Sequence, residues 1–315
     1  MFLEVKNLCK TYGEKQVLKD VNFSLDEGNI LCILGPSGCG KTTILNSIGG
    51  FIKNDSGQII LNGEDISSLN PEERNISTVF QSYGLFSNKN VLENVAYGLK
   101  FRNVKKYDRV NQSMEILKIV GLEGYEFRKI HELSGGQRQR VALARSLVIS
   151  PRLILLDEPF SNLDKNLRIT MRNEIKKLVK YFKMTTILVT HDQEDAFTMA
   201  DQVILMNEGK IIQNSTVTEL YNSPNSDFSL SFIGNSNKLE NDNFIRPEKI
   251  KIVEYENENP AEIVAKQFRG AFIEYIIMLK KNKEKTLKVV ELNTGNEKNI
   301  GDDIFIEYNS QKLSI

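Results

Sequence analysis

The chain has 315 residues, enough for one large domain and a smaller one, each with its own core. Lys and Arg together number 41, as do Asp and Glu, so no bulk charge attracts nucleic acid or anionic lipid. The first residues lack the apolar core of a signal peptide, and no apolar run reaches membrane-spanning length. The three cysteines, Cys9, Cys32 and Cys39, show neither metal-ligand spacing nor a disulfide framework. We therefore expect a cytosolic protein that reaches a membrane only through a partner and that binds no nucleic acid.

The chain begins with two predicted strands, over residues 2–12 and 17–25. Tyr12 ends the first strand and precedes a glycine. Its ring could stack on an adenine base, but a half-buried turn tyrosine is the commoner arrangement.

A glycine-rich loop follows the next predicted strand, residues 30–34. Its sequence fits the pattern G-x-x-x-x-G-K-[ST], and the apolar residues after it recur at helical spacing. Glycines let successive backbone N–H groups point at an anion, and the helix N-terminus, a lysine ammonium and a threonine hydroxyl complete a phosphate and Mg²⁺ site. The loop therefore predicts a site for a nucleoside triphosphate. Its residues are Gly35, Pro36, Ser37, Gly38, Cys39, Gly40, Lys41, Thr42 and Thr43.

Two further strands are predicted over residues 57–63 and 76–80, and Gln81 follows the second. Polar groups at strand ends face the ligand crevice of open α/β sheets. Residues 91–99, 110–120 and 137–149 then carry apolar side chains at helical spacing with no strand between them. This pattern predicts a helical subdomain, about residues 82–151, inserted into a sheet domain.

The last of these helices opens with the run Ser134, Gly135, Gly136 and Gln137. A serine and two glycines at a helix start are either an ordinary cap or a second anion site. Taken alone, the run favours the cap.

An apolar strand over residues 153–158 ends in the acidic pair Asp157 and Glu158. A carboxylate at such a strand end can hold Mg²⁺, and its neighbour can deprotonate an attacking water. Asp164 opens a long amphipathic helix, and a β-branched strand over residues 186–190 ends at His191. His191 is either a ligand-facing residue or a buried structural histidine.

The C-terminal part differs in character. Residues 236–243 form a polar stretch that we interpret as a linker, and short strands are predicted over 261–267, 271–279, 287–292 and 303–308. We expect an ATPase domain over residues 1–235 and a small β domain over residues 244–315.

These motifs, in this order, resemble the ATP-binding subunits of ABC transporters over residues 1 to about 235. The resemblance implies an α/β P-loop NTPase fold with a RecA-like core, an antiparallel β subdomain and the inserted helical subdomain. The Arg246-Pro247-Glu248 entry resembles the C-terminal TOBE-like domain, small, all-β and OB-like, of importer ATPases. In that group this domain packs against its twin and sometimes senses cargo.

The resemblance also implies roles. Tyr12 would stack on adenine, Thr42, Gln81 and Asp157 would hold Mg²⁺, and Glu158 would be the catalytic base. His191 would contact the γ-phosphate, Lys41 would support catalysis, and Asp164 would lie at a dimer interface. Residues Ser134, Gly135, Gly136 and Gln137 would contact ATP held by a second ATPase subunit.

The implied partners are that second copy, two integral membrane permease subunits and, indirectly, an extracytoplasmic solute-binding protein. The implied location is the cytoplasmic face of the cell membrane, and the implied cofactors are ATP and Mg²⁺.

The solute is less defined. Residues 156–164 and 120–124 look most like ferric-iron importers, whereas residues 232–237 are similar to the spermidine/putrescine group; phosphonate or another solute is a further alternative. The stretch Ser87–Asn90 departs from both groups, in a region that would touch the permease.

A soluble ABC ATPase of translation or DNA repair is an alternative of another class, although this chain has neither tandem cassettes nor a coiled-coil insertion. A P-loop kinase or GTPase would leave the 133–137 run and His191 without a role. At Cys39, we favour a space-filling role over thiol modification.

Overall fold

The computed structural model describes residues 1–241 and 243–313, with the side chains of residues 283 and 284 excepted. Residue 242 of the predicted linker and residues 314–315 of the predicted C-terminal domain lie outside the described residues. The chain forms two compact units, Met1–Thr218 and Glu219–Ile315. The division falls within α7 (Val217–Asn222) and thus before the predicted linker. The predicted domain boundaries stay a prediction, because packing units are not by themselves independently folding domains.

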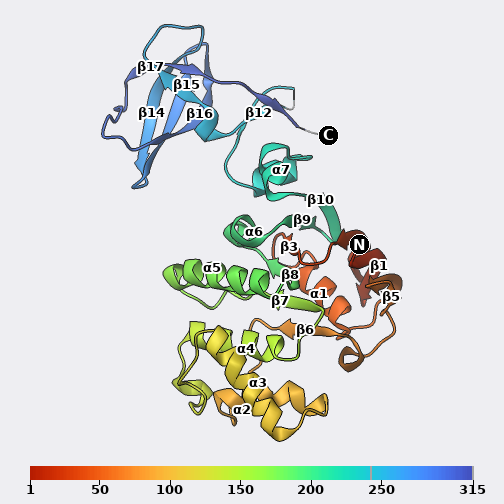
Figure 1. Cartoon of the computed structure of the whole chain (residues 1–315). Coiled ribbons are helices and arrows are strands. Elements are labelled where there is room, and N and C mark those ends of the chain that lie inside the picture. The colour runs from red at the N-terminus through yellow and green to blue at the C-terminus, as the bar shows by residue number, and fades with distance from the viewer. Residues whose placement is uncertain (242, 314–315) are drawn as a thin grey trace. The chain divides into compact units, whose positions relative to one another are not determined.

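The first unit is built on a six-stranded sheet with the order β10-β9-β3-β8-β7-β6 (Figure 1). All neighbours pair in parallel except β9 and β10. Every residue of β3, β7 and β8 is buried, as expected for parallel strands that are covered on both faces. The strands are β3 (Ile30–Leu34), β6 (Ile76–Val79), β7 (Leu153–Asp157), β8 (Thr185–Thr190), β9 (Gln202–Asn207) and β10 (Lys210–Ser215).

A second, antiparallel sheet has the order β2-β1-β4-β5. Its apolar side chains share one core with helix α1 (Lys41–Gly49) and with alternate residues of the parallel sheet. Ile44, Leu45 and Ile48 of α1 are fully buried in this core. Strong apolar packing around α1 therefore fixes the loop that precedes the helix. The strands are β1 (Leu3–Tyr12), β2 (Lys15–Leu25), β4 (Ser56–Leu61) and β5 (Glu64–Asp65).

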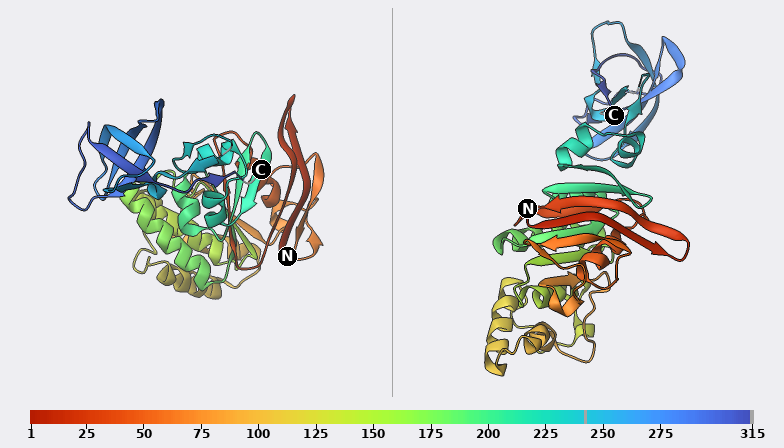
Figure 2. Two further views of the ribbon diagram at one scale, coloured as in Figure 1. Left: turned by 90° about the horizontal axis from the view of Figure 1, so that it is seen from above. Right: turned by 90° about the vertical axis from the view of Figure 1, so that its right-hand side faces the viewer.

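Three helices follow β6 without an intervening strand: α2 (Val91–Phe101), α3 (Lys106–Ile119) and α4 (Gly135–Leu147). They pack on one another and gather at one end of the first unit (Figures 1 and 2). Asn94, fully buried on α2, accepts from Phe86 N and donates to Phe86 O and Asn90 O, so its amide fixes the segment before the helix. Helices α5 (Lys165–Tyr181) and α6 (Gln193–Met199) then flank β8 in sequence.

The second unit contains a five-stranded antiparallel sheet, β13-β17-β14-β15-β16, and a three-stranded sheet, β11-β12-β18. Asn237, within the predicted linker, exchanges two hydrogen bonds of 2.7 Å with the backbone of Lys288. The predicted α/β fold with a C-terminal β region is confirmed. The elements of this unit are α8 (Asp227–Phe232), β11 (Asn237–Lys238), β12 (Asn243–Ile245), β13 (Lys251–Val253), β14 (Pro260–Phe268), β15 (Phe272–Leu279), β16 (Asn282–Leu292), β17 (Asp303–Glu307) and β18 (Gln311–Lys312).

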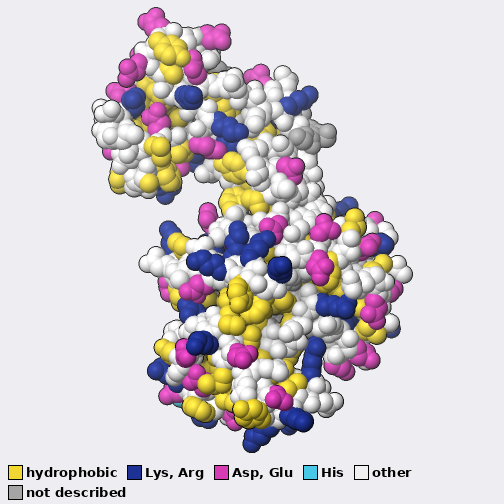
Figure 3. Space-filling view, in the orientation of Figure 1, with side chains coloured by type: hydrophobic (Ala, Val, Ile, Leu, Met, Phe, Trp, Pro, Cys, Tyr) yellow, Lys and Arg dark blue, Asp and Glu magenta, His cyan; other side chains and the backbone are white. Residues whose placement is uncertain are grey.

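Among the described residues, none of the helices is both long enough and apolar enough to cross a membrane. Figure 3 shows acidic and basic side chains on both units, as the equal numbers of the two signs predict.

Candidate functional site

The glycine-rich loop connects β3 to α1, and two of its glycines are required by close packing. A Cβ on Gly35 would lie 2.4 Å from Met206 O, and one on Gly40 would lie 2.9 Å from Leu18 Cδ2. Gly40 also caps α1 with a φ of 110°, a backbone conformation that side chains disfavour. The loop is therefore pressed against β2 and β9, and its curl cannot open without disturbing the core.

Lys41 is buried inside this loop, with 5% of its surface exposed. Its Nζ donates to Gly35 O and Pro36 O, each at 2.8 Å. Both acceptors are neutral, and none of the ion pairs formed by the described residues includes Lys41. A buried ammonium group without an anionic partner, at the positive end of the α1 dipole, is suited to bind an anion such as a phosphate.

Thr42 and Asp157 supply neighbouring oxygen atoms beside the loop. Thr42 Oγ1 donates to Asp157 Oδ1 at 3.2 Å, and Asp157 ends β7 with 9% of its surface exposed. Burial raises the pKa of Asp157; the Thr42 hydrogen bond opposes this, and the charge of Glu158 adds to it. Within the described part of the chain, no three His, Cys, Asp or Glu side chains form a metal cluster. One hydroxyl and one carboxylate fit Mg²⁺, which takes few protein ligands and completes its shell with water and phosphate oxygens.

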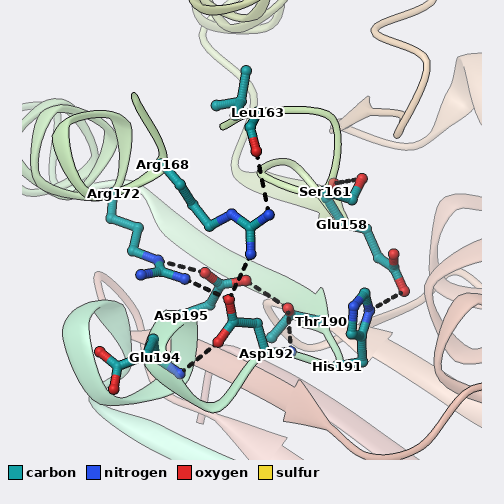
Figure 4. Close-up of polar contacts among 10 residues, drawn as sticks. All are labelled: Glu158, Ser161, Leu163, Arg168, Arg172, Thr190, His191, Asp192, Glu194 and Asp195. Atoms are coloured by element: carbon teal, nitrogen blue, oxygen red, sulfur yellow. Dashed lines mark hydrogen bonds and ion pairs between the residues drawn. The ribbon is translucent and has the colours of Figure 1, made fainter. Parts of the chain in front are cut away.

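Glu158 and His191 meet at the ends of two adjacent strands (Figure 4). His191 Nδ1 lies 3.2 Å from Glu158 Oε1, and the two side chains are 52% and 20% exposed. His191 is therefore not a buried structural histidine. Glu158 has a φ of 43°, and its N donates to Val189 O at 2.9 Å, which ties this left-handed turn to β8. A carboxylate held by an imidazole in this way can orient a water molecule and accept its proton.

Gln81, at the end of β6, is connected to the turn that follows Glu158. Its Nε2 donates to Ser161 Oγ at 3.1 Å, and Ser161 Oγ in turn donates to Glu158 O at 3.0 Å. Asn162 Nδ2 donates to Gln81 O at 2.9 Å. Ser161 and Asn162 were not among the predicted site residues. Two short polar side chains in a turn beside the acidic pair are the feature of the sequence that could have indicated them.

The run at the start of α4 forms a complete capping box. Gln137 N donates to Ser134 Oγ at 3.3 Å, and Ser134 N donates to Gln137 Oε1 at 2.9 Å. A Cβ on Gly135 would lie 3.2 Å from Leu163 Cδ2, and one on Gly136 would lie 3.1 Å from Leu167 Cδ1. Capping and close packing thus account for this run within one chain, and none of the described hydrogen bonds joins it to the phosphate loop. Contact with ATP of another copy stays a prediction.

Asp164 is the N-cap of α5, where its Oδ1 accepts from Leu167 N at 3.0 Å. Its side chain is exposed, so it is free to meet a partner, and its interface role stays a prediction.

A cavity of about 480 Å³ adjoins the phosphate loop on the side of β2. Its lining comes from three segments: residues 14–17 and 19, residues 36–39 of the loop, and residues 207–209 at the end of β9 and in the turn to β10. Tyr12 does not line it; the residue is 49% exposed, and Lys10 Nζ lies 5.4 Å from its ring centroid. Stacking of Tyr12 on adenine stays a prediction.

Cys39 is 4% exposed, and burial raises the pKa of its thiol. A reactive cysteine needs a lowered pKa and access to solvent, so this environment favours the space-filling role.

Comparisons with known proteins identify the family and several relatives of the chain. Residues 18–161 match the family model described as "ABC transporter". The chain is 47% identical over 235 residues to the Fe(3+) ions import ATP-binding protein FbpC of Mannheimia succiniciproducens, covering 75% of this chain and 67% of that relative. It is 46% identical over 249 residues to the spermidine/putrescine import ATP-binding protein PotA of Mycoplasma capricolum, covering 79% and 71%.

Two solved structures are similar to about two thirds of the chain. A dimeric ATP-binding cassette in a post-hydrolysis state, bound to ADP and Pi, is 34% identical with a TM-score of 0.61, covering 68% of this chain and 98% of that one. The cbiO1 protein of Clostridium perfringens, part of the ABC transporter complex cbiONQ, is 30% identical with a TM-score of 0.64, covering 70% and 90%.

Proposed function

The chain belongs to the family of ABC transporter ATP-binding proteins, and from this membership we propose that it is the ATP-hydrolysing subunit of an importer for a small solute. The observation that carries the proposal is the buried ammonium group of Lys41, which donates to neutral backbone carbonyls, forms no ion pair among the described residues and lies at the N-terminus of α1. The triphosphate of ATP would supply the missing negative charge. We place the protein on the cytoplasmic face of the membrane, bound through two permease subunits.

Mg²⁺ would be held by Thr42 and Asp157, with Gln81 as a further ligand, directly or through water. Thr42 and Asp157 already lie together, which supports this assignment. The bound ion supplies charge neutralisation at the phosphate oxygens during phosphoryl transfer. The residues of this chain hold and orient the reacting groups around it.

Glu158 would be the catalytic base. In the proposed step, its carboxylate orients a water molecule and takes one proton as the water oxygen bonds to the γ-phosphorus. The bond between that phosphorus and the β–γ bridging oxygen breaks, and ADP leaves with the electron pair. His191 would hold the carboxylate through Nδ1, as the 3.2 Å contact supports, and would present its other ring nitrogen to the γ-phosphate. Lys41 would neutralise charge on the phosphates, as its place within the loop suggests.

A second copy of the chain would complete the site. Ser134, Gly135, Gly136 and Gln137 would face the ATP of the partner, with Asp164 at the same interface. The exposed Ser134 and the N-terminus of the 13-residue helix α4 support this role. ATP would then join two copies, and hydrolysis would release them, which is the two-state movement that permease subunits could use to alternate access.

Ferric iron is our first candidate for the solute, and spermidine or putrescine is the second. The relatives named for iron and for spermidine/putrescine are 47% and 46% identical to this chain, so they favour neither. The preference for iron rests on the sequence of residues 156–164 and 120–124.

The test is ATP hydrolysis and solute uptake in proteoliposomes that contain the full chain and its permease subunits. We expect hydrolysis to rise when a binding protein loaded with ferric iron is added. Stimulation only by a polyamine-loaded binding protein selects the second candidate. Copurification with ribosomes, without any membrane protein, would contradict the importer function.

A further inference from the structure

Two turns of the site end close to helix α5. The first, residues 158–164, follows β7 and carries Glu158. The second, residues 191–192, follows β8 and carries His191. Figure 4 shows Arg168, from the first turn of α5, lying between these two turns.

Arg168 bonds to both turns with one guanidinium group. Its Nη1 lies 3.0 Å from Asp192 Oδ2, and its Nη2 donates to Leu163 O at 3.2 Å. A guanidinium is planar and rigid, so bonds from two of its nitrogens fix the separation of their acceptors. Arg168 therefore fixes how far Leu163 lies from the residue that follows His191.

The Asp192 end of this bridge is anchored in the protein. Arg172 Nη2 lies 2.6 Å from Asp192 Oδ2, and Arg172 Nε lies 2.5 Å from Asp195 Oδ1. Thr190 Oγ1 donates to Asp195 and accepts from Asp192 N. The side chains of Arg172 and Asp195 are 6% and 4% exposed, so this buried ion pair holds Asp192 in place. Arg168 is 30% exposed and lies nearer the surface.

The Leu163 end lies beside the segments of this chain that would face the second copy. Leu163 precedes Asp164, and its side chain packs against Gly135, in the space next to the missing Cβ. A displacement of this turn, such as a partner would cause, acts on Leu163 O and through Arg168 on Asp192 and His191.

We propose that Arg168 is a positioning residue that couples the turn facing the second copy to His191. In this role Arg168 would act through the placement of His191 against Glu158 and not by direct contact with the reacting groups. The proposal rests on the roles of His191 and Glu158 given under the proposed function.

The test compares kcat, KM for ATP and the thermal unfolding midpoint of full-length variants. Arg168→Met keeps the aliphatic stem but removes both bonds. Arg168→Lys keeps the charge but lacks the fork. The matched control is Lys180→Met, which removes another α5 ion pair, Lys180 with Asp201 at 2.8 Å, far along the helix from both turns.

We expect Arg168→Met to lower kcat about tenfold with KM changed by less than about threefold. The decrease in log kcat should be more than half as large in Arg168→Lys as in Arg168→Met. Lys180→Met should lower the unfolding midpoint as much as Arg168→Met does but leave kcat unchanged. Because Arg168 acts through His191, the double variant with His191→Ala should be no slower than His191→Ala alone.

The proposal is overturned if the two losses of kcat multiply in the double variant. It is also overturned if kcat of Arg168→Met stays within about twofold of that of the unchanged chain. If His191→Ala keeps full kcat, the site assignment under the proposed function fails as well, which separates the two failures. If Arg168→Met does not fold, Asp192→Asn weakens the same bridge from its other end and is judged by the same criteria.

Discussion

The hydroxyl of Thr42 lies 3.2 Å from the carboxylate of Asp157, although 115 positions separate the two residues in the chain. Thr42 lies in the first turn of α1 and Asp157 ends β7, and these two elements pack together in the core. The contact therefore links the helix that follows the phosphate loop with the strand that carries the acidic pair.

Asp157→Asn should stabilise the nucleotide-free protein at neutral pH. The folded pKa of Asp157 is raised, chiefly by burial, so the folded state binds this proton more tightly than the unfolded state does. The carboxylate consequently costs stability above its folded pKa, and this cost disappears as the pH falls below the ordinary value of 3.8. Urea unfolding between pH 8 and about pH 4 measures the difference between variant and unchanged chain, which should be largest at the upper end. The same variant should lose most Mg²⁺-dependent hydrolysis. A variant that is less stable than the unchanged chain at pH 8 contradicts the prediction.

Lys41→Met should weaken ATP binding about 100-fold, or about 2.7 kcal/mol, while the nucleotide-free protein keeps its stability within about 1 kcal/mol. The reason is that Lys41 is buried and forms no ion pair with another described residue, so its removal relieves a desolvated charge. Titration with a fluorescent nucleotide measures the change in affinity, and urea unfolding measures the change in stability. A loss of several kcal/mol in stability would show that Lys41 acts mainly as a structural residue.

Glu158→Gln should keep ATP binding and stabilise a closed dimer while turnover falls about 1,000-fold. The amide keeps the size and the contact to His191 but cannot take a proton. Size-exclusion chromatography with ATP should show a dimer that the unchanged chain forms only briefly. Near-normal hydrolysis in this variant would refute the assigned base.

Arg246→Met should destabilise the second unit by about 3 kcal/mol. Arg246 is fully buried and donates to three backbone carbonyls, at Ile233 (2.6 Å), Tyr221 (2.8 Å) and Asn235 (3.0 Å). Its guanidinium carbon also lies 4.2 Å from the centroid of the Tyr221 ring. Methionine fills the space but leaves these carbonyls without their donor. Hydrogen exchange should increase in residues 219–313 and stay unchanged in β3, β7 and β8; equal increases in both units would contradict the prediction.

Local patterns predicted much of the fold. Apolar runs located β3, β7 and β8 within one residue at each end, because buried parallel strands are apolar throughout. Our sequence predictions contain no element between residues 192 and 235, where α6, β9, β10, α7 and α8 lie. The helices among these have only six or seven residues, too short to establish a clear period.

By itself, the sequence determined the phosphate loop, the acidic pair and the order of the motifs, because each depends on residues adjacent in the chain. The tertiary structure alone decided that His191 meets Glu158, that Ser161 joins Gln81 to Glu158, and that Arg168 spans Leu163 and Asp192. These contacts follow from the strand order β3-β8-β7-β6, which places the ends of separate strands side by side. Hydrophobic periodicity specifies which face of a strand is buried, but it does not specify which strand becomes its neighbour.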